Sequence, residues 1–130
     1  MKTTRRNFIK KVALAGATAS LPTTLLASQN ANGKMIHQVF FWLNDGVDTA
    51  AFKKEASKLG LCPTVDQFFI GEPAPTEDRD VVDSSYQVAC TLFFDSLEDQ
   101  NKYQVDPMHL AFIEKNSMKW SQVKVYDFVI

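Results

Sequence analysis

Four short segments of the chain are predominantly apolar, and such runs, bounded by turn residues, predict β-strands. The first strand covers residues 35–43 and is apolar on both faces: Val39, Phe41 and Leu43 share one face, and Ile36, Phe40 and Trp42 share the other. The other three cover residues 64–71, 86–94 and 122–130. All four are rich in β-branched and aromatic residues, which favour a pleated, half-buried surface.

Three segments between these strands predict helices. The first covers residues 49–59, with Asp48 as its N-cap and Gly60 as its stop. The second begins at the capping-box pattern Ser96-Leu97-Glu98-Asp99 and runs to about residue 104. Pro107 suits the first turn of the third, residues 107–117. The residues expected on the buried sides are Ala51, Phe52, Ala56 and Leu59 in the first helix and Leu110, Phe112, Ile113 and Met118 in the third.

The order strand–helix–strand–strand–helix–strand predicts an α+β domain with the ferredoxin-like βαββαβ arrangement. Both helical regions then cover one face of the sheet, and residues 72–85, rich in Pro and acidic residues, form a long exposed loop. The strands at 35–43 and 86–94 are apolar on the other face too. A second copy that packs sheet on sheet is the economical way to bury that face.

The first 33 residues have the character of an export signal rather than of the fold. Thr4-Arg5-Arg6-Asn7-Phe8-Ile9-Lys10 resembles the bacterial twin-arginine (Tat) signal peptide pattern, in which Arg5 and Arg6 are the signal residues. A short apolar stretch follows, softened by Gly and Pro. An ordinary secretory signal is the alternative, and cleavage after Ala27 or Ala31, or retention as an anchor, stays open. We therefore expect a signal and linker at 1–33, a domain at 34–130, and a periplasmic or otherwise exported protein.

The net charge of the residues beyond 33 limits the kinds of partner that we expect. Beyond residue 33, nine Lys and Arg stand against fifteen Asp and Glu, a net charge of −6. Nucleic acid and anionic membrane surfaces both need clustered positive charge, so neither is an expected partner, and no membrane contact is expected beyond the signal. Cys62 and Cys90 could meet across a hairpin as a disulfide or remain buried free thiols, with the thiols the plainer interpretation. Their spacing with the histidines does not match a zinc site, so no metal is expected.

The candidate chemistry lies in the two histidines and one tyrosine. His109 is suited to act as a general base, and Tyr103 to donate a hydrogen bond to a developing oxyanion. Alternatively, His109 orders the helix break at Asp106-Pro107 by hydrogen-bonding, with Asp106 as an N-cap, and His37 is an ordinary core residue. The break leaves the distance between Tyr103 and His109 open.

Two segments carry a family resemblance: Ile36-His37-Gln38-Val39-Phe40-Phe41 and Tyr103-Gln104-Val105-Asp106-Pro107-Met108-His109. Through them the chain resembles the stress-responsive A/B barrel (Dabb) domain family, within the dimeric α+β barrel group. The resemblance implies a homodimer whose two sheets form a barrel, with a pocket between the sheet and the helices of each subunit and no cofactor. A plant polyketide cyclase is similar to this family. There the residues that match His109 and Tyr103 are catalytic, and the one that matches His37 lines the pocket.

Three functions fit this sequence. The first is an exported, stress-associated protein that binds a small hydrophobic or phenolic ligand without chemistry. The second is a cofactor-free lyase, similar to the polyketide cyclase, that uses His109 and Tyr103. The third, from fold analogy alone, is a cofactor-free monooxygenase. In each case the expected pocket residues are His37, Val39, Phe41 and Phe112.

Overall fold

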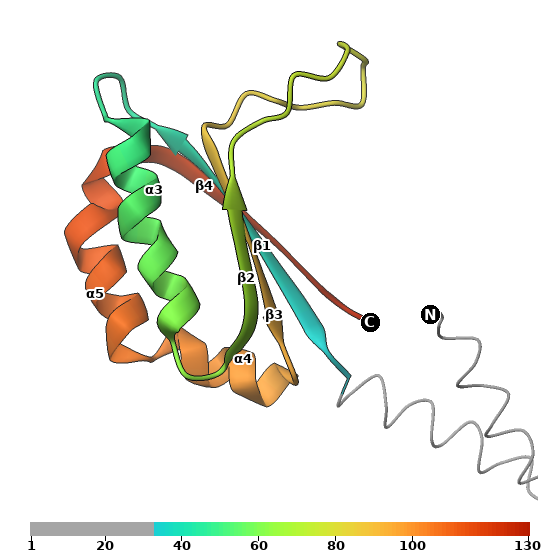
Figure 1. Ribbon diagram of the computed structural model, residues 1–130, viewed down its shortest axis with the longest axis vertical. Helices are drawn as coiled ribbons and strands as arrows, with labels where there is room; N and C mark the ends of the chain where they lie inside the picture. The colour runs from blue at the N-terminus through green and yellow to red at the C-terminus, as the bar shows by residue number, and fades with distance from the viewer. Residues whose placement is uncertain (1–32) are drawn as a thin grey trace, which may run out of the picture.

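The computed structural model describes residues 33–130 (Figure 1). The predicted signal residues Arg5 and Arg6, and both suggested cleavage sites, lie outside the described residues. The elements are β1 (Met35–Leu43), α3 (Thr49–Ser57), β2 (Val65–Gly71), β3 (Val88–Phe94), α4 (Leu97–Gln104), α5 (Pro107–Asn116) and β4 (Trp120–Val129). Short 3-10 turns follow α3 at Lys58–Leu61 and α5 at Ser117–Lys119. The expected order of strands and helices is therefore confirmed, with ends that differ by a few residues.

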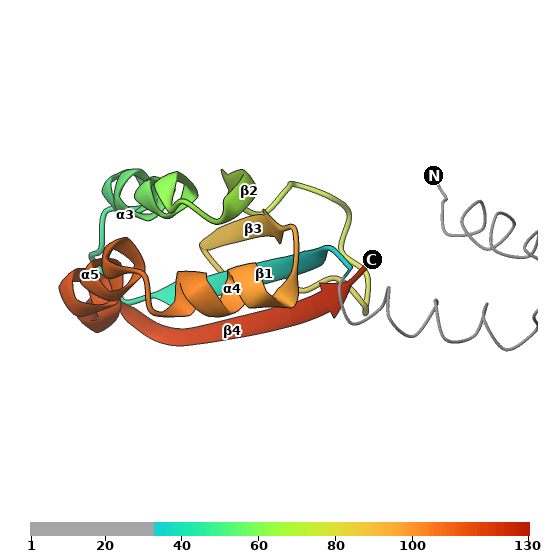
Figure 2. The ribbon, with the colours of Figure 1, turned by 90° about the horizontal axis from the view of Figure 1, so that it is seen from below.

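The four strands form one antiparallel sheet in the order β2-β3-β1-β4, which is the predicted ferredoxin-like topology. The helices lie on one side of the sheet (Figure 1), and β4 forms the edge opposite β2 (Figure 2). In the pairing of β1 with β4, His37 is opposite Asp127, Val39 is opposite Val125, and Phe41 is opposite Val123. Because alternate residues of a strand face the same side, all six side chains face the helices.

The hydrophobic core lies between this face and the helices. Val88, Cys90, Leu92 and Phe94 from β3 are almost fully buried there, together with Phe52 and Ala56 from α3. Tyr103 from α4 and Phe112 from α5 complete the cluster. Both cysteines are buried free thiols, which agrees with the plainer of the two expectations.

Each helix begins at the residue that its local sequence indicates. Asp48 caps α3 by accepting a hydrogen bond from the amide of Ala51, and Ser96 caps α4 in the same way from Asp99. Asp106 caps α5 by accepting a hydrogen bond from the amide of Met108. These side chains satisfy amides that have no partner within the helix, which separates α4 from α5 at the predicted break.

Gly60 has a different role from the expected helix stop. Its backbone is not left-handed; among the glycines of residues 33–130, only Gly46, in the turn after β1, has a positive φ, of 87°. A Cβ atom at Gly60 would lie 2.8 Å from the ring of Phe68 on β2. Glycine is needed here because the 3-10 turn passes close to a core side chain.

The packing of α5 differs from the expected buried side. Phe112 is buried, but Leu110, Ile113 and Met118 are exposed by 52%, 38% and 64%. In α3, Ala51 is exposed as well, whereas Phe52 and Ala56 are buried. The helices present more apolar residues than their narrow contact with the sheet can cover, so sequence periodicity overestimated the buried stripe.

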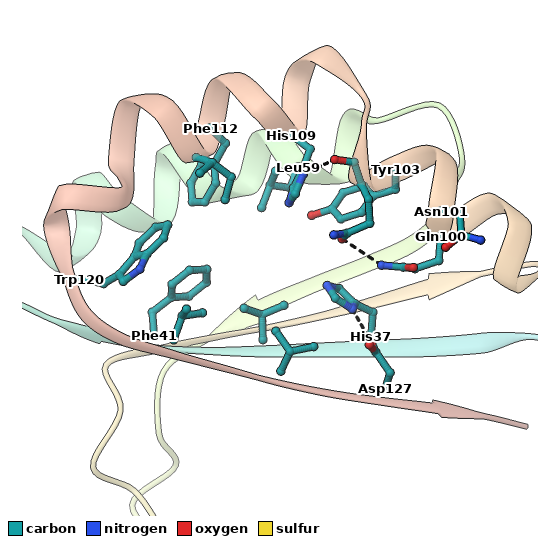
Figure 3. A pocket seen from close by; sticks show the side chains of 15 residues that line it. His37, Phe41, Leu59, Gln100, Asn101, Tyr103, His109, Phe112, Trp120 and Asp127 are labelled. Carbon is teal, nitrogen blue, oxygen red and sulfur yellow. Dashed lines mark hydrogen bonds and ion pairs between the residues drawn. The ribbon is translucent and has the colours of Figure 1, made fainter.

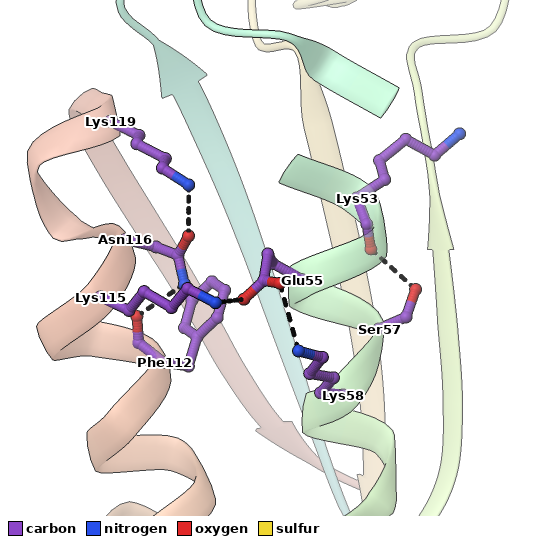
Figure 4. A network of polar contacts seen from close by, with 8 residues as sticks. All are labelled: Lys53, Glu55, Ser57, Lys58, Phe112, Lys115, Asn116 and Lys119. Atoms are coloured by element: carbon purple, nitrogen blue, oxygen red, sulfur yellow. Dashed lines mark hydrogen bonds and ion pairs between the residues drawn. The ribbon is translucent and has the colours of Figure 1, made fainter. Parts of the chain in front are cut away.

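A polar network holds α3 beside α5 (Figure 4). Glu55 on α3 is 3.1 Å from the ammonium of Lys58 and 3.2 Å from that of Lys115 on α5. Asn116, fully buried, donates to the carbonyl of Phe112 and accepts from Lys119. Exposed ion pairs of this kind add little to stability, so the network links the two helices while core packing supplies most of the stability.

On the face of the sheet away from the helices, aromatic side chains are left exposed by the described part of the chain, residues 33–130. Phe69, Tyr126 and Phe128 are exposed there by 58%, 53% and 45%. Residues 72–87 connect β2 to β3 and project beyond the sheet (Figure 1), as expected for the acidic, proline-containing loop.

Candidate functional site

A cavity of about 490 Å³ lies between the sheet and the helices (Figure 3). Its volume is in the range typical of small-molecule sites. Aromatic side chains gather at one end, and polar side chains at the other. The apolar end contains Phe41, Phe112 and Trp120, and the polar end contains His37, Gln100, Tyr103, His109 and Asp127.

His37 points into the cavity from the sheet and is paired with a carboxylate. Its Nδ1 lies 2.5 Å from Oδ1 of Asp127 on β4. A carboxylate only accepts hydrogen bonds, so Nδ1 is the donor and Nε2 is left free for the cavity. The His37 side chain is 7% exposed and that of Asp127 is 43% exposed, so the pair extends from the interior to the open edge at β4.

Tyr103 is only 1% exposed and forms one wall of the polar end. Its ring lies 5.9 Å from that of His37 in an edge-to-face arrangement. No residue in 33–130 hydrogen-bonds to its hydroxyl. Burial raises the pKa of Tyr103 far above its ordinary value, with smaller contributions from Cys62, Cys90 and Asp106. The hydroxyl therefore stays protonated and is a hydrogen-bond donor that faces the cavity.

His109 both orders the helix break and lines the cavity, so the two interpretations offered by the sequence hold together. Its Nδ1 donates to the backbone carbonyl of Gln104, 3.1 Å away, across the break. Its ring centroid is only 4.5 Å from that of Tyr103, a distance that the sequence left open. Burial lowers the pKa of His109 despite the opposing bond to Gln104. The neutral ring then has a free acceptor, Nε2.

The predicted apolar residues Val39, Phe41 and Phe112 all line the cavity. Trp120, at the start of β4, joins them and was not predicted. Its ring centroid is 5.1 Å from that of Phe41 and 6.0 Å from that of Phe112. This end offers a flat aromatic surface that favours an aromatic or otherwise hydrophobic ligand body.

Sequence reasoning also missed four polar residues of the site: Gln100, Asn101, Gln104 and Asp127. Gln100 and Gln104 lie one helical turn apart on α4, and the amide of Gln100 donates to that of Gln104 over 3.0 Å. The available signals were indirect. Asp127 interrupts an apolar strand, and the spacing of Gln100, Tyr103 and Gln104 puts all three on one side of a helix.

The lining of the cavity carries no Lys or Arg. Within residues 33–130, no three His, Cys, Asp or Glu side chains are grouped so as to hold a metal ion. Among the same residues, no helix has the length and apolar character needed to cross a membrane.

This fold and cavity define a ferredoxin-like α+β domain with an open pocket between its sheet and its helices. Residues 35–130 match the stress responsive A/B barrel domain (Dabb) family, and the chain belongs to that family. No curated protein sequence matches the chain.

Solved structures share the fold at low sequence identity. A hydroxynitrile lyase from Passiflora edulis is 18% identical with a TM-score of 0.64, over 76% of this chain and 94% of that one. A protein from Thermobifida fusca, described as dimeric, ferredoxin-like and of unknown function, is 19% identical with a TM-score of 0.61, over 76% and 92%. A Dabb family protein from Mesorhizobium loti is 18% identical with a TM-score of 0.59, over 75% and 97%. Identities this low show a common fold and no common activity.

Proposed function

We propose that the cavity binds a small hydrophobic or phenolic ligand and catalyses proton transfer at its polar end, as a cofactor-free lyase. The observation that carries this proposal is a set of three polar atoms there that have no hydrogen-bond partner among residues 33–130. Nε2 of His37, Nε2 of His109 and the hydroxyl of Tyr103 face one space from opposite walls (Figure 3). Buried polar groups normally have partners, so three unpaired ones in one cavity favour a polar ligand group between them.

The geometry assigns a role to each group. His109, held neutral by burial, accepts a proton through Nε2 from the carbon next to a ligand carbonyl. The C–H bond breaks, its electron pair moves to the carbonyl oxygen, and the hydroxyl of Tyr103 donates to the oxyanion that forms. His37, oriented by Asp127, offers a second nitrogen on the opposite side. A ligand that is only stored in the cavity needs neither base, so the arrangement favours the lyase over passive binding.

The comparison with the Passiflora edulis protein supports this choice at the level of fold. A hydroxynitrile lyase shows that this scaffold accommodates lyase chemistry. The monooxygenase hypothesis gains no support from the cavity and still rests on fold analogy.

Deuterium exchange tests the proposal without knowledge of the natural substrate. We expect the protein to accelerate exchange at the benzylic carbon of phenylacetone in heavy water, measured by proton NMR. His109→Gln should slow the enzymatic rate by about 10²-fold or more, because a general base typically contributes 10²–10⁴-fold. If wild type and variant both bind phenylacetone without exchange, the lyase proposal is wrong and the passive binding function is supported instead. Oxygen consumption with electron-rich phenols would instead favour the monooxygenase.

We also propose that the protein is a homodimer, formed through the uncovered face of the sheet. The exposed Phe69 and Phe128 support this, and solved proteins of the same fold are described as dimeric. Analytical ultracentrifugation should show a dimer that Phe128→Glu converts to a monomer. Leu110→Glu, at a residue 52% exposed against 45% for Phe128 but on α5 rather than the sheet, is the matched control and should leave the dimer intact.

Export by the twin-arginine route is part of the same proposal and rests on the pattern at residues 4–10. Fractionation of cells should find the protein outside the cytoplasm. Replacing both Arg5 and Arg6 with Lys should retain it inside, while replacing Lys10 and Lys11 with Arg should not.

A further inference from the structure

The amides of Gln100 and Gln104 form a pair on the cavity wall that the proton-transfer step does not use. Gln100 is 7% exposed, and Gln104 lies at the rim. The Nε2 of Gln100 donates to Oε1 of Gln104, 3.0 Å away. Neither the oxygen of Gln100 nor the nitrogen of Gln104 has a hydrogen-bond partner among residues 33–130.

The same hydrogen-bonding capacity remains whichever way the two amides are oriented. One bond between them uses one donor and one acceptor. If both amides were rotated by 180°, the bond would run from Gln104 to Gln100 and leave one oxygen and one nitrogen free again. The pair therefore offers one acceptor and one donor side by side.

A hydroxyl group matches this pair with a single atom, because it donates one hydrogen bond and accepts others. On α4, Gln100 lies at i, i+3 from Tyr103 and at i, i+4 from Gln104, so its side chain neighbours both on the helix surface, about 5–6 Å away at Cβ. A carbonyl held by Tyr103 thus places a hydroxyl on the adjacent carbon within range of the two amides.

The charge of the wall sets the remaining limit on the ligand. Its lining has no Lys or Arg, and Asp127 stands at the same polar end. A carboxylate or phosphate group on the ligand would find no cation there and would be repelled by Asp127, which disfavours its burial.

From these observations we infer that Gln100 and Gln104 select neutral hydroxy ketones or hydroxy aldehydes, in which a hydroxyl lies next to the carbonyl. The inference rests on the proposed function, since it takes the carbonyl to be held by Tyr103 and the histidines. It adds the substrate class and the two residues that determine it.

Two ketones that differ by one hydroxyl test the inference by isothermal titration calorimetry. Phenylacetone has only the carbonyl, and 1-hydroxy-1-phenylpropan-2-one has the same skeleton with the adjacent hydroxyl. The wild-type protein should bind the hydroxy ketone about tenfold more tightly, as two net hydrogen bonds imply. Phenylpyruvate, which replaces the methyl group with a carboxylate, should bind more weakly than phenylacetone.

The decisive variant replaces both amides, Gln100→Leu with Gln104→Leu. Removing both partners leaves no buried group unpaired, so the fold is expected to persist. The tenfold preference for the hydroxy ketone over phenylacetone should fall to about one. Gln67→Leu, which removes an exposed amide on β2 outside the cavity lining, is the matched control and should keep the preference. If the double variant does not fold, Gln104→Leu alone, at the exposed rim, should reduce the preference by about threefold.

The outcomes separate the two proposals. If wild type and double variant both bind phenylacetone and show the same preference for the hydroxy ketone, the role of the two glutamines is overturned. The proposed function is not contradicted by that result. Failure of the wild-type protein to bind either ketone would overturn the proposed function and this inference with it. Tighter binding of phenylpyruvate than of phenylacetone would contradict the neutral substrate class.

Discussion

Replacement of Tyr103 by Phe separates stability from function in this site. The hydroxyl is removed from a side chain that is 1% exposed, and no residue in 33–130 is its partner. An unpaired buried hydroxyl costs about 1–3 kcal/mol. The cavity opens at β4, where Val125 and Asp127 are exposed, so water relieves part of that cost. We therefore expect the free energy of unfolding to stay unchanged or to rise by up to about 1 kcal/mol.

The same change should impair proton transfer. Without the hydroxyl, the developing oxyanion loses its donor, and loss of one such donor typically slows a reaction by about 10²–10³-fold. Urea unfolding followed by circular dichroism gives the stability, and deuterium exchange into phenylacetone gives the rate. Tyr126→Phe removes the same atom from an exposed tyrosine on the opposite face and should leave the rate unchanged.

Two results would refute this reasoning. A loss of more than about 1 kcal/mol in Tyr103→Phe would mean that the hydroxyl has a structural partner. An unchanged exchange rate would mean that Tyr103 does not donate to the reacting oxygen.

Three further predictions follow from burial and close packing. Because burial lowers the pKa of His109, the folded protein binds this proton less readily than the unfolded chain. The contribution of His109 to the unfolding free energy is then complete above its ordinary pKa of 6.5 and is lost as the pH falls toward the lowered pKa of the folded protein. Urea unfolding at a series of pH values should show this fall in stability in wild type and not in His109→Gln. Gly60→Ala should lower the unfolding free energy by about 1–3 kcal/mol, measured in urea, because its Cβ would meet Phe68; Gly71→Ala, with open space at that position, is the control. Burial raises the pKa of Cys62 to about 11 and of Cys90 to about 12, so neither thiol should react with a disulfide reagent at pH 8 until urea unfolds the protein.

Much of the fold was predictable because its signals are local. The N-caps Asp48, Ser96 and Asp106 each bind an amide two or three residues away, so their role is readable from the chain. The short run of β-branched and aromatic residues at 35–43 identified a strand in the same way. The buried side of α5 was not predictable, because its exposed apolar residues depend on how much of the helix the sheet covers.

For the site as well, local signals were predictable from the sequence and long-range contacts were not. The chain pointed to His37, Tyr103 and His109 through their residue types and family motifs, since few other groups in it suit acid–base chemistry. It did not contain their distances, because the break at Asp106 redirects α5 by an amount that only packing against the sheet decides. Asp127 is 90 residues from His37, and the two meet only through the register of β1 with β4. Sequence alone therefore determined the elements and the reactive groups, whose signals lie within a few residues. The tertiary structure decided which groups share a cavity and which remain unpaired there, because contacts between distant segments depend on the packing of the whole chain.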